Sequence, residues 1–455
     1  MWTVAQLAAD LDRGRTTSRE LVEQALAKIN DPDGEGRRAF MAVYVDSARA
    51  AADYSDALRK KGVRRSAVEG LPVSIKDLFD VAGEVTRAGS KILAAQPPAN
   101  TDAGAVARLR AAGAVLIGRT NMVEFAFGGV GLNPHYGTPR NPYGRPRAGS
   151  DGASLGGRVP GGSSSGAAVA QADGMCVMAL GTDTRGSIRG PSALCGVTGF
   201  KPTARRTPRD GAFPLSYALD SVGPLANSVA CCAAYDAVLS GEPDGGPAVP
   251  VQMLRLLLPL SSALEDLEPQ VSKAFESALA RLSKAGALIV KVPVPAFDRQ
   301  AEYFKGGGFA GAESYYIHRR WLDRLGEYDP RVGKRILLGK DLSGADYVAL
   351  GFLRREFQAE VEALATPFDA ILMPTAPCIA PTIAETDRSD EDYFRWNARI
   401  LRNNGLVNFL DGCAVSLPCH EPGAAPVGLS VCGTAGTDRR LLAVAAAIEK
   451  ALARG

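Results

Sequence analysis

Apolar and polar positions along this 455-residue chain fall into blocks of strand length and blocks of helix length. Short apolar runs predict buried strands at 71–76, 114–117, 176–180, 254–258, 288–292 and 370–373. Longer segments with apolar residues every three or four positions predict helices at 103–112, 167–173, 228–239, 268–285 and 345–365. Because strands and helices alternate, the pattern favours an α/β fold with a mixed, mostly parallel sheet covered on both faces by helices.

The N-terminal segment is predicted to be helical. Thr17 and Glu20 have the spacing of a capping box, and the apolar residues that follow recur on one helical face: Leu21, Ala25, Leu26 and Ile29. The segment lacks the basic start and apolar core of a secretory signal, and no apolar run reaches the roughly 18 residues that a membrane span needs. A Gly-, Arg- and Ser-rich stretch at 144–154 is predicted to be a surface loop.

Composition narrows the class of protein. Apolar residues make up 46% of the chain and charged residues 22%, as in an ordinary globular protein. The formal net charge of +3 is too weak for us to expect a nucleic-acid partner. The eight cysteines include no C-x-x-C pair, so we expect buried, reduced thiols and no metal site. We also expect a cytoplasmic protein without a membrane partner.

Two glycine-rich turns carry the serines that point to chemistry. The first turn spans 160–166 and contains Gly162 and Ser163, and the second spans 181–187 and ends at Ser187. Glycine permits positive φ and close backbone approach, so two such turns can bring hydroxyls and free backbone N–H groups to one point. This arrangement is typical of an acyl-transfer site.

A lysine upstream supplies a candidate base. Lys76 ends the predicted strand 71–76, where burial would lower its pKa toward the range in which it accepts a proton. A serine hydroxyl needs such a base before it becomes a good nucleophile. We interpret Asp183 and the three histidines as structural, because none lies in a nucleophile-elbow pattern: His135, His318 and His420.

These same segments make the chain resemble the amidase signature family. A lysine on a strand, a Gly-Gly-Ser-Ser turn and a later Gly-Thr-Asp-x-Gly-Gly-Ser turn match the positions of Lys76, Ser163 and Ser187. Further similar segments lie at 116–122, 133–142, 195–202 and 372–375, so the likeness covers nearly the whole chain. It implies one amidase domain over 1–455, with N-terminal helices in 1–65, a signature core in 66–240, and the rest of the sheet and the substrate-pocket helices in 241–455.

The resemblance also implies roles for individual residues. Lys76 would be the base, Ser163 the bridging serine after a cis peptide bond, and Ser187 the nucleophile of a Ser-Ser-Lys triad. The oxyanion would be bound by four consecutive backbone N–H groups: Thr184, Arg185, Gly186 and Ser187. No metal or cofactor is implied.

Arg185 departs from the resemblance, because the family usually has glycine there. Its side chain would project near the acyl site, so Arg185 is a candidate substrate-pocket residue. Gly162, in the first turn, is a second candidate. Either the arginine favours acidic or carbonyl-rich substrates, or it impairs the site. Aromatic residues gather in 302–345, where they either line the pocket mouth or pack in the core.

The implied function is hydrolysis of a small linear amide or amide-like C–N bond, other than a peptide bond, through an acyl-Ser187 intermediate. The expected partner is a small-molecule amide, and a homodimer is left open. Three alternatives stay open. The first is the A subunit of an aminoacyl-tRNA amidotransferase, which releases ammonia from glutamine for companion subunits and in which Arg355 would grip the substrate carboxylate. The others are a hydrolase of carboxybiuret or related ureas and a catalytically impaired scaffold.

Overall fold

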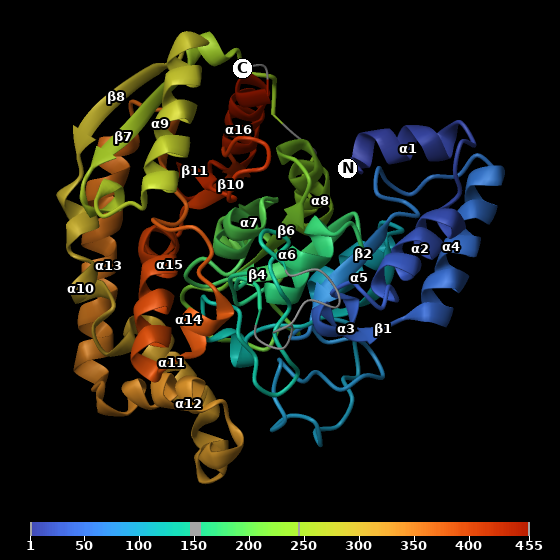
Figure 1. The fold of residues 1–455 in the computed structure, drawn as a ribbon, viewed down its shortest axis with the longest axis horizontal. Coiled ribbons are helices and arrows are strands. Elements are labelled where there is room, and N and C mark those ends of the chain that lie inside the picture. The colour runs from blue at the N-terminus through green and yellow to red at the C-terminus, as the bar shows by residue number, and fades with distance from the viewer. Residues whose placement is uncertain (1, 146–155, 244–245, 454–455) are drawn as a thin grey trace.

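A computed structural model describes residues 2–145, 156–243 and 246–453, and its strands form one eleven-stranded sheet (Figure 1). The strand order is β1-β3-β2-β4-β6-β5-β10-β11-β9-β7-β8. The strands are β1 (Phe40–Val43), β2 (Pro72–Lys76), β3 (Val115–Thr120), β4 (Met178–Asp183), β5 (Thr198–Lys201), β6 (Ser221–Ala226), β7 (Arg255–Leu260), β8 (Leu288–Pro293), β9 (Ala370–Pro374), β10 (Cys413–Pro418) and β11 (Gly428–Gly433). The predicted α/β domain is confirmed. All but the first two residues of the predicted loop at 144–154 lie outside the described residues.

Strand pairing in the sheet is mixed, as predicted. β2 pairs in parallel with β3 and β4, and β7 pairs in parallel with β8 and β9. The other neighbouring strands pair antiparallel, including β6, β5, β10 and β11 in the centre. The parallel pairs therefore form two groups on either side of an antiparallel centre.

Successive apolar residues of a strand point to opposite faces of the sheet, where they enter different cores. In β3, Leu116 packs in one core, whereas Val115 and Ile117 pack in another. Helices α8 (Val229–Ser240) and α16 (Asp438–Ala453) contribute to the first core, and α2 (Ser18–Ile29), α4 (Val45–Lys60) and α6 (Ser165–Ala172) to the second. Helices thus cover both faces, as the sequence pattern predicts.

The remaining helices lie over the centre of the sheet, as α7 does, or toward its two ends (Figure 1). They are α1 (Val4–Asp12), α3 (Gly36–Ala39), α5 (Gly104–Ala111), α7 (Arg189–Cys195), α9 (Pro269–Lys284), α10 (Gln300–Tyr303), α11 (Gly308–His318), α12 (Pro330–Leu337), α13 (Gly344–Ala365), α14 (Ile383–Asp387) and α15 (Asp390–Leu410). Helices α1, α2 and α4 lie at one end, and α9, α10 and α13 lie at the other. The capping box at Thr17 is confirmed.

Two further expectations concern the cysteines and membrane-spanning helices. All eight cysteines are free and buried, which confirms the prediction of buried thiols. Along the described ranges, no helix combines the length and the apolar character needed to cross a membrane.

The fold brings the two serine turns together. Strand β2 lies beside β4, so Lys76 at the end of β2 is close to the turn that follows β4. The first turn leads into α6 and the second into α7, and these two helices pack against each other. The candidate site therefore lies where β2, β4, α6 and α7 meet.

Candidate active site

Lys76 and Ser163 are joined inside the protein. Lys76 is fully buried, and its Nζ lies 2.7 Å from the Ser163 Oγ and 2.8 Å from the Thr182 Oγ1. Burial lowers the pKa of Lys76 to about 7, against the opposing effect of Asp220 and Asp183. A neutral amine is therefore accessible near neutral pH. The Gly162–Ser163 peptide bond is cis, as the resemblance implies.

Ser187 lies between β4 and α7, beside the first turn. The side chain is close to fully buried, and the backbone N–H of Ser164 donates to the Ser187 carbonyl oxygen at 3.3 Å. This bond fixes the two turns against each other. Among the described residues no hydrogen bond joins the hydroxyls of Ser163 and Ser187, so proton relay between them stays a prediction.

Asp183 holds the turn that carries Ser187. Its carboxylate accepts hydrogen bonds from the backbone N–H groups of Gly186 (2.7 Å) and Ile188 (3.2 Å) and from the Arg189 guanidinium (2.9 and 3.0 Å). Burial alone would raise the pKa of Asp183, but the Arg189 guanidinium holds that pKa below its usual range. Asp183 therefore acts as an ionised anchor for the backbone.

The backbone of this turn corrects the expected set of oxyanion donors. The sequence places the Gly186 N–H among them, but that group donates to Asp183 instead, because the carboxylate lies inside the turn. The candidate donors that remain are the N–H groups of Thr184, Arg185 and Ser187. The positive φ of the turn is at Gly186 (121°) and not at Arg185, so the arginine does not strain the backbone.

A small cavity borders Ser187. It has about 260 Å³ of empty space, and apolar side chains form much of its wall: Phe127, Leu215, Ala310 and Leu401. Arg185 and Arg335 also line this cavity. Gly162, the other predicted pocket residue, does not line the cavity, and its N–H donates to the Gly129 carbonyl oxygen at 2.7 Å.

The sequence model of the Amidase family matches residues 20–442, which include Lys76, Ser163 and Ser187. The chain belongs to the Amidase family. It is 36% identical over 414 residues to the 2-amino-5-chloromuconic acid deaminase of Comamonas testosteroni, covering 90% of this chain and 87% of that protein. It is 37% identical over 385 residues to AtzE, the 1-carboxybiuret hydrolase subunit of Pseudomonas sp. (strain ADP), covering 81% of this chain and 80% of that protein.

Another relative and a solved structure extend this likeness to almost the full chain. The A subunit of the glutamyl-tRNA(Gln) amidotransferase of Chloroflexus aurantiacus (strain ATCC 29366 / DSM 635 / J-10-fl) is 32% identical over 485 residues, covering 98% of this chain and 96% of that protein. A crystal structure of an amidase has a TM-score of 0.86 at 32% identity and covers 99% of both chains. This Amidase-family protein is an enzyme that hydrolyses C–N bonds other than peptide bonds.

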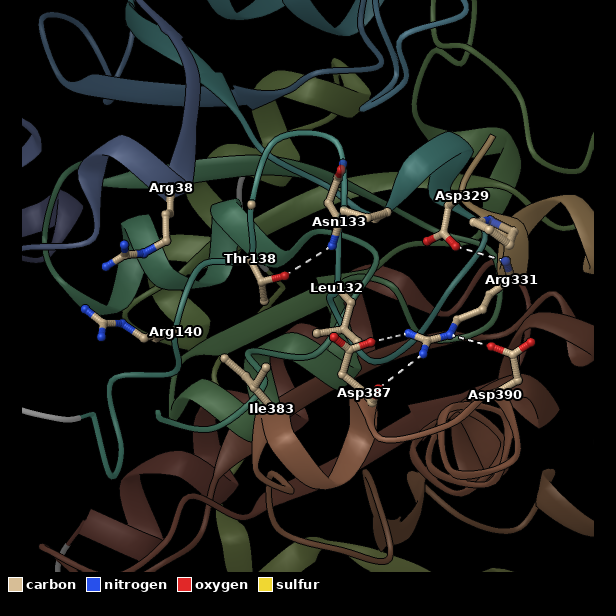
Figure 2. Close-up of a pocket in the computed structure, with 13 residues that line it drawn as sticks. Arg38, Leu132, Asn133, Thr138, Arg140, Asp329, Arg331, Ile383, Asp387 and Asp390 are labelled. Carbon is tan, nitrogen blue, oxygen red and sulfur yellow. Dashed lines mark hydrogen bonds and ion pairs between the residues drawn. The ribbon is translucent and has the colours of Figure 1, made fainter. Parts of the chain in front are cut away.

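A second, larger hollow in this amidase has none of the three predicted triad residues in its wall (Figure 2). Arg331 is ion-paired there with Asp387 (2.6 Å) and Asp390 (3.0 Å), and Arg140 is paired with Glu35 at 2.7 Å. These cations already have carboxylate partners within the protein. The hollow is therefore a weaker candidate for binding an anionic substrate than the cavity beside Ser187.

The arginine beside Ser187 that sequence reasoning missed is Arg335. Arg355, which the amidotransferase alternative requires, is exposed on α13 and stacks over the Phe352 ring at 4.3 Å. Arg335 comes from α12, inside the aromatic-rich segment 302–345, and that segment was the only signal for it. Among the described aromatic residues of this segment, Tyr303 packs in the core and Phe304 contacts Arg185, and none of them lines the cavity beside Ser187.

Replacing Asp183 with asparagine should lower the free energy of unfolding by about 3 kcal/mol, because Arg189 would lose its buried counter-charge. Urea unfolding followed by circular dichroism measures this difference. The matched control is Asp390→Asn, which breaks exposed ion pairs and should cost less than about 1 kcal/mol. Equal losses in the two variants would show that Asp183 is not the anchor of the turn.

Proposed function

We propose that this amidase cleaves a small linear amide or amide-like substrate through an acyl-Ser187 intermediate. The observation that carries the proposal is the 2.7 Å contact between the buried Lys76 amine and the Ser163 hydroxyl, beside the turn of Ser187. This contact gives a lysine with a lowered pKa direct access to a serine in the first turn.

The proposed reaction begins with neutral Lys76. Lys76 takes the proton of Ser163 while Ser163 takes the proton of Ser187, and the Ser187 Oγ attacks the carbonyl carbon of the substrate. The N–H groups of Thr184, Arg185 and Ser187 stabilise the negative charge on the carbonyl oxygen. The C–N bond breaks as Ser163 gives its proton to the leaving nitrogen and recovers one from protonated Lys76, which becomes neutral again. Water then attacks the ester while its proton passes through Ser163 to Lys76, and the same path returns that proton to the Ser187 oxygen as the acid leaves.

The test uses the purified chain alone with a panel of primary amides, anilides, carbamates and ureas. We expect release of ammonia or amine from at least one class. Added hydroxylamine should divert part of the acyl group into a hydroxamate, because an ester intermediate reacts with either nucleophile. A chelator should leave the rate unchanged. Turnover without any hydroxamate would contradict the acyl-enzyme.

The rival function is that of a glutaminase component within an amidotransferase, favoured by the full-length relative from Chloroflexus aurantiacus. That function predicts glutamine hydrolysis only when companion proteins are present. Hydrolysis by the isolated chain counts against it. Carboxybiuret-like ureas are part of the substrate panel, and an impaired scaffold predicts no turnover of any substrate.

A further inference from the structure

Two arginines beside Ser187 have no carboxylate partner among the described residues. Arg185 comes from the turn after β4 and Arg335 from α12, and both line the cavity. Within the part of the chain that the structure describes, neither forms an ion pair with an aspartate or glutamate. Their neighbour Arg189 shows the usual solution for a buried arginine, since it pairs with Asp183 at 2.9 Å.

The surroundings of Arg185 leave its charge uncompensated. Its guanidinium stacks over the Phe304 ring at 3.7 Å, and its Nε is buried without a hydrogen-bond partner among the described residues. Burial, together with the nearby charge of Arg335, lowers the pKa of Arg185 to about 9. Stacking on an aromatic ring stabilises the cation only in part.

Arg335, on α12, is also buried against an aromatic ring without a carboxylate partner among the described residues. Its side chain is only 9% exposed and lies over the Phe127 ring at 4.2 Å. Its Nη1 donates to the Phe127 carbonyl oxygen at 2.8 Å and, more weakly, to the Asn397 Oδ1 at 3.4 Å. A guanidinium has five N–H donors on three nitrogens, so these bonds from one nitrogen leave donors for a ligand.

Burying two like charges without a counter-ion costs several kcal/mol. A bound anion removes much of this cost, and a carboxylate matches the planar fork of a guanidinium. Because both arginines share a cavity wall with Ser187, an anion held there lies next to the reacting bond.

We infer that the substrate carries a carboxylate, which Arg185 and Arg335 bind while its amide carbon lies against Ser187. The inference rests on the proposed acyl-Ser187 chemistry and adds the substrate class to it. Arg335 becomes a specificity-determining residue. The apolar walls that exclude water strengthen both contacts to the carboxylate.

The test compares amides that differ only in charge. Malonamate is paired with acetoacetamide, succinamate with levulinamide, and glutaramate with 5-oxohexanamide, because a methyl group replaces one carboxylate oxygen in each pair. For at least one pair, kcat/KM should favour the carboxylate by about tenfold or more, mainly through KM. A preference below tenfold in all three pairs would overturn the inference.

Variants locate the source of the preference. Arg185→Met and Arg335→Met should each reduce the preference by about tenfold, and Arg335→Lys should keep part of it because the positive charge remains. The matched control is Arg319→Met, since Arg319 is exposed and stacks over the Tyr316 ring at 4.1 Å. That control should keep the full preference. An equal drop in Arg319→Met would overturn the assignment.

Binding to the Ser187→Ala protein separates this inference from the proposed chemistry. Calorimetry should show that the carboxylate of at least one pair binds about tenfold more tightly than its neutral partner. Tight carboxylate binding without turnover by the natural protein would uphold the arginine site and contradict the acyl-Ser187 proposal. Turnover of both members of each pair at equal rates, with equal binding, would contradict the arginine site and leave the acyl-Ser187 proposal in place.

Discussion

Replacing Ser187 with alanine should reduce amide hydrolysis by about 10⁵-fold, equivalent to about 7 kcal/mol of barrier. The variant loses the attacking oxygen, and only substrate binding and oxyanion stabilisation remain. A fluorophosphonate should add once to the natural protein, with the adduct mapped to residue 187 by peptide mass spectrometry. The variant should show no adduct.

The control for this prediction lies in the same serine-rich segment. Ser165 is fully buried, and its hydroxyl has no hydrogen-bond partner among the described residues. Ser165→Ala should therefore keep both the adduct and a rate within about tenfold of the natural enzyme. A fluorophosphonate adduct on Ser163, or an active enzyme that is never labelled, would contradict the assignment of Ser187.

Replacing Lys76 with alanine should slow turnover by about 10³-fold, or about 4 kcal/mol of barrier, because no other base contacts Ser163 among the described residues. In the natural enzyme only the neutral amine accepts a proton, and burial lowers the pKa of Lys76 to about 7. The rate should therefore be low in acid, rise as the pH passes through about 7, and level off above it. Initial rates over this pH range measure the profile.

Lys201 offers a matched control for that profile. It is also a fully buried lysine whose pKa is lowered by burial, but its Nζ donates to the carbonyl oxygens of Pro202 and Gly412. Lys201→Gln should keep the midpoint of the pH profile whatever its stability. Retained activity in Lys76→Ala, or a rate that falls as the pH rises through 7, would rule out lysine as the base.

The sequence predicted the parallel parts of the sheet better than its centre. Strands β2, β3, β4, β7, β8 and β9 were predicted to within a few residues, because each contains a run of mostly apolar residues that stands out from its flanking sequence. Strands β5, β6, β10 and β11 were not predicted, since serine, glycine and proline interrupt their apolar pattern. Some of their side chains are paired only in the folded sheet, as where the Thr375 hydroxyl lies 2.8 Å from those of Ser416 and Ser430.

The candidate site was likewise predicted in part and missed in part. The association of Lys76 with Ser163 was predicted from the resemblance to the amidase signature family, which places both residues in one triad. The position of Arg335 was not predicted, because it depends on a contact with Phe127, which is 208 positions away in the chain. The use of the Gly186 N–H by Asp183 also depends on the folded turn, which residue types alone do not specify.

The turn that carries Ser187 is completed from the far end of the chain. Arg189 donates to the Asn404 carbonyl oxygen (3.0 Å) and to the Asn408 side chain (2.6 Å), both in α15. A Cβ at Gly186 would lie 2.5 Å from the Cβ of Asn404, so α15 also limits what this position accepts. A fragment ending near residue 240 would contain all three proposed triad residues. It would still lack α15, whose contacts hold the turn that carries Ser187. We therefore expect the proposed chemistry to require α15, and substitutions in α15 to shift the turn of Ser187 without contacting the serine itself.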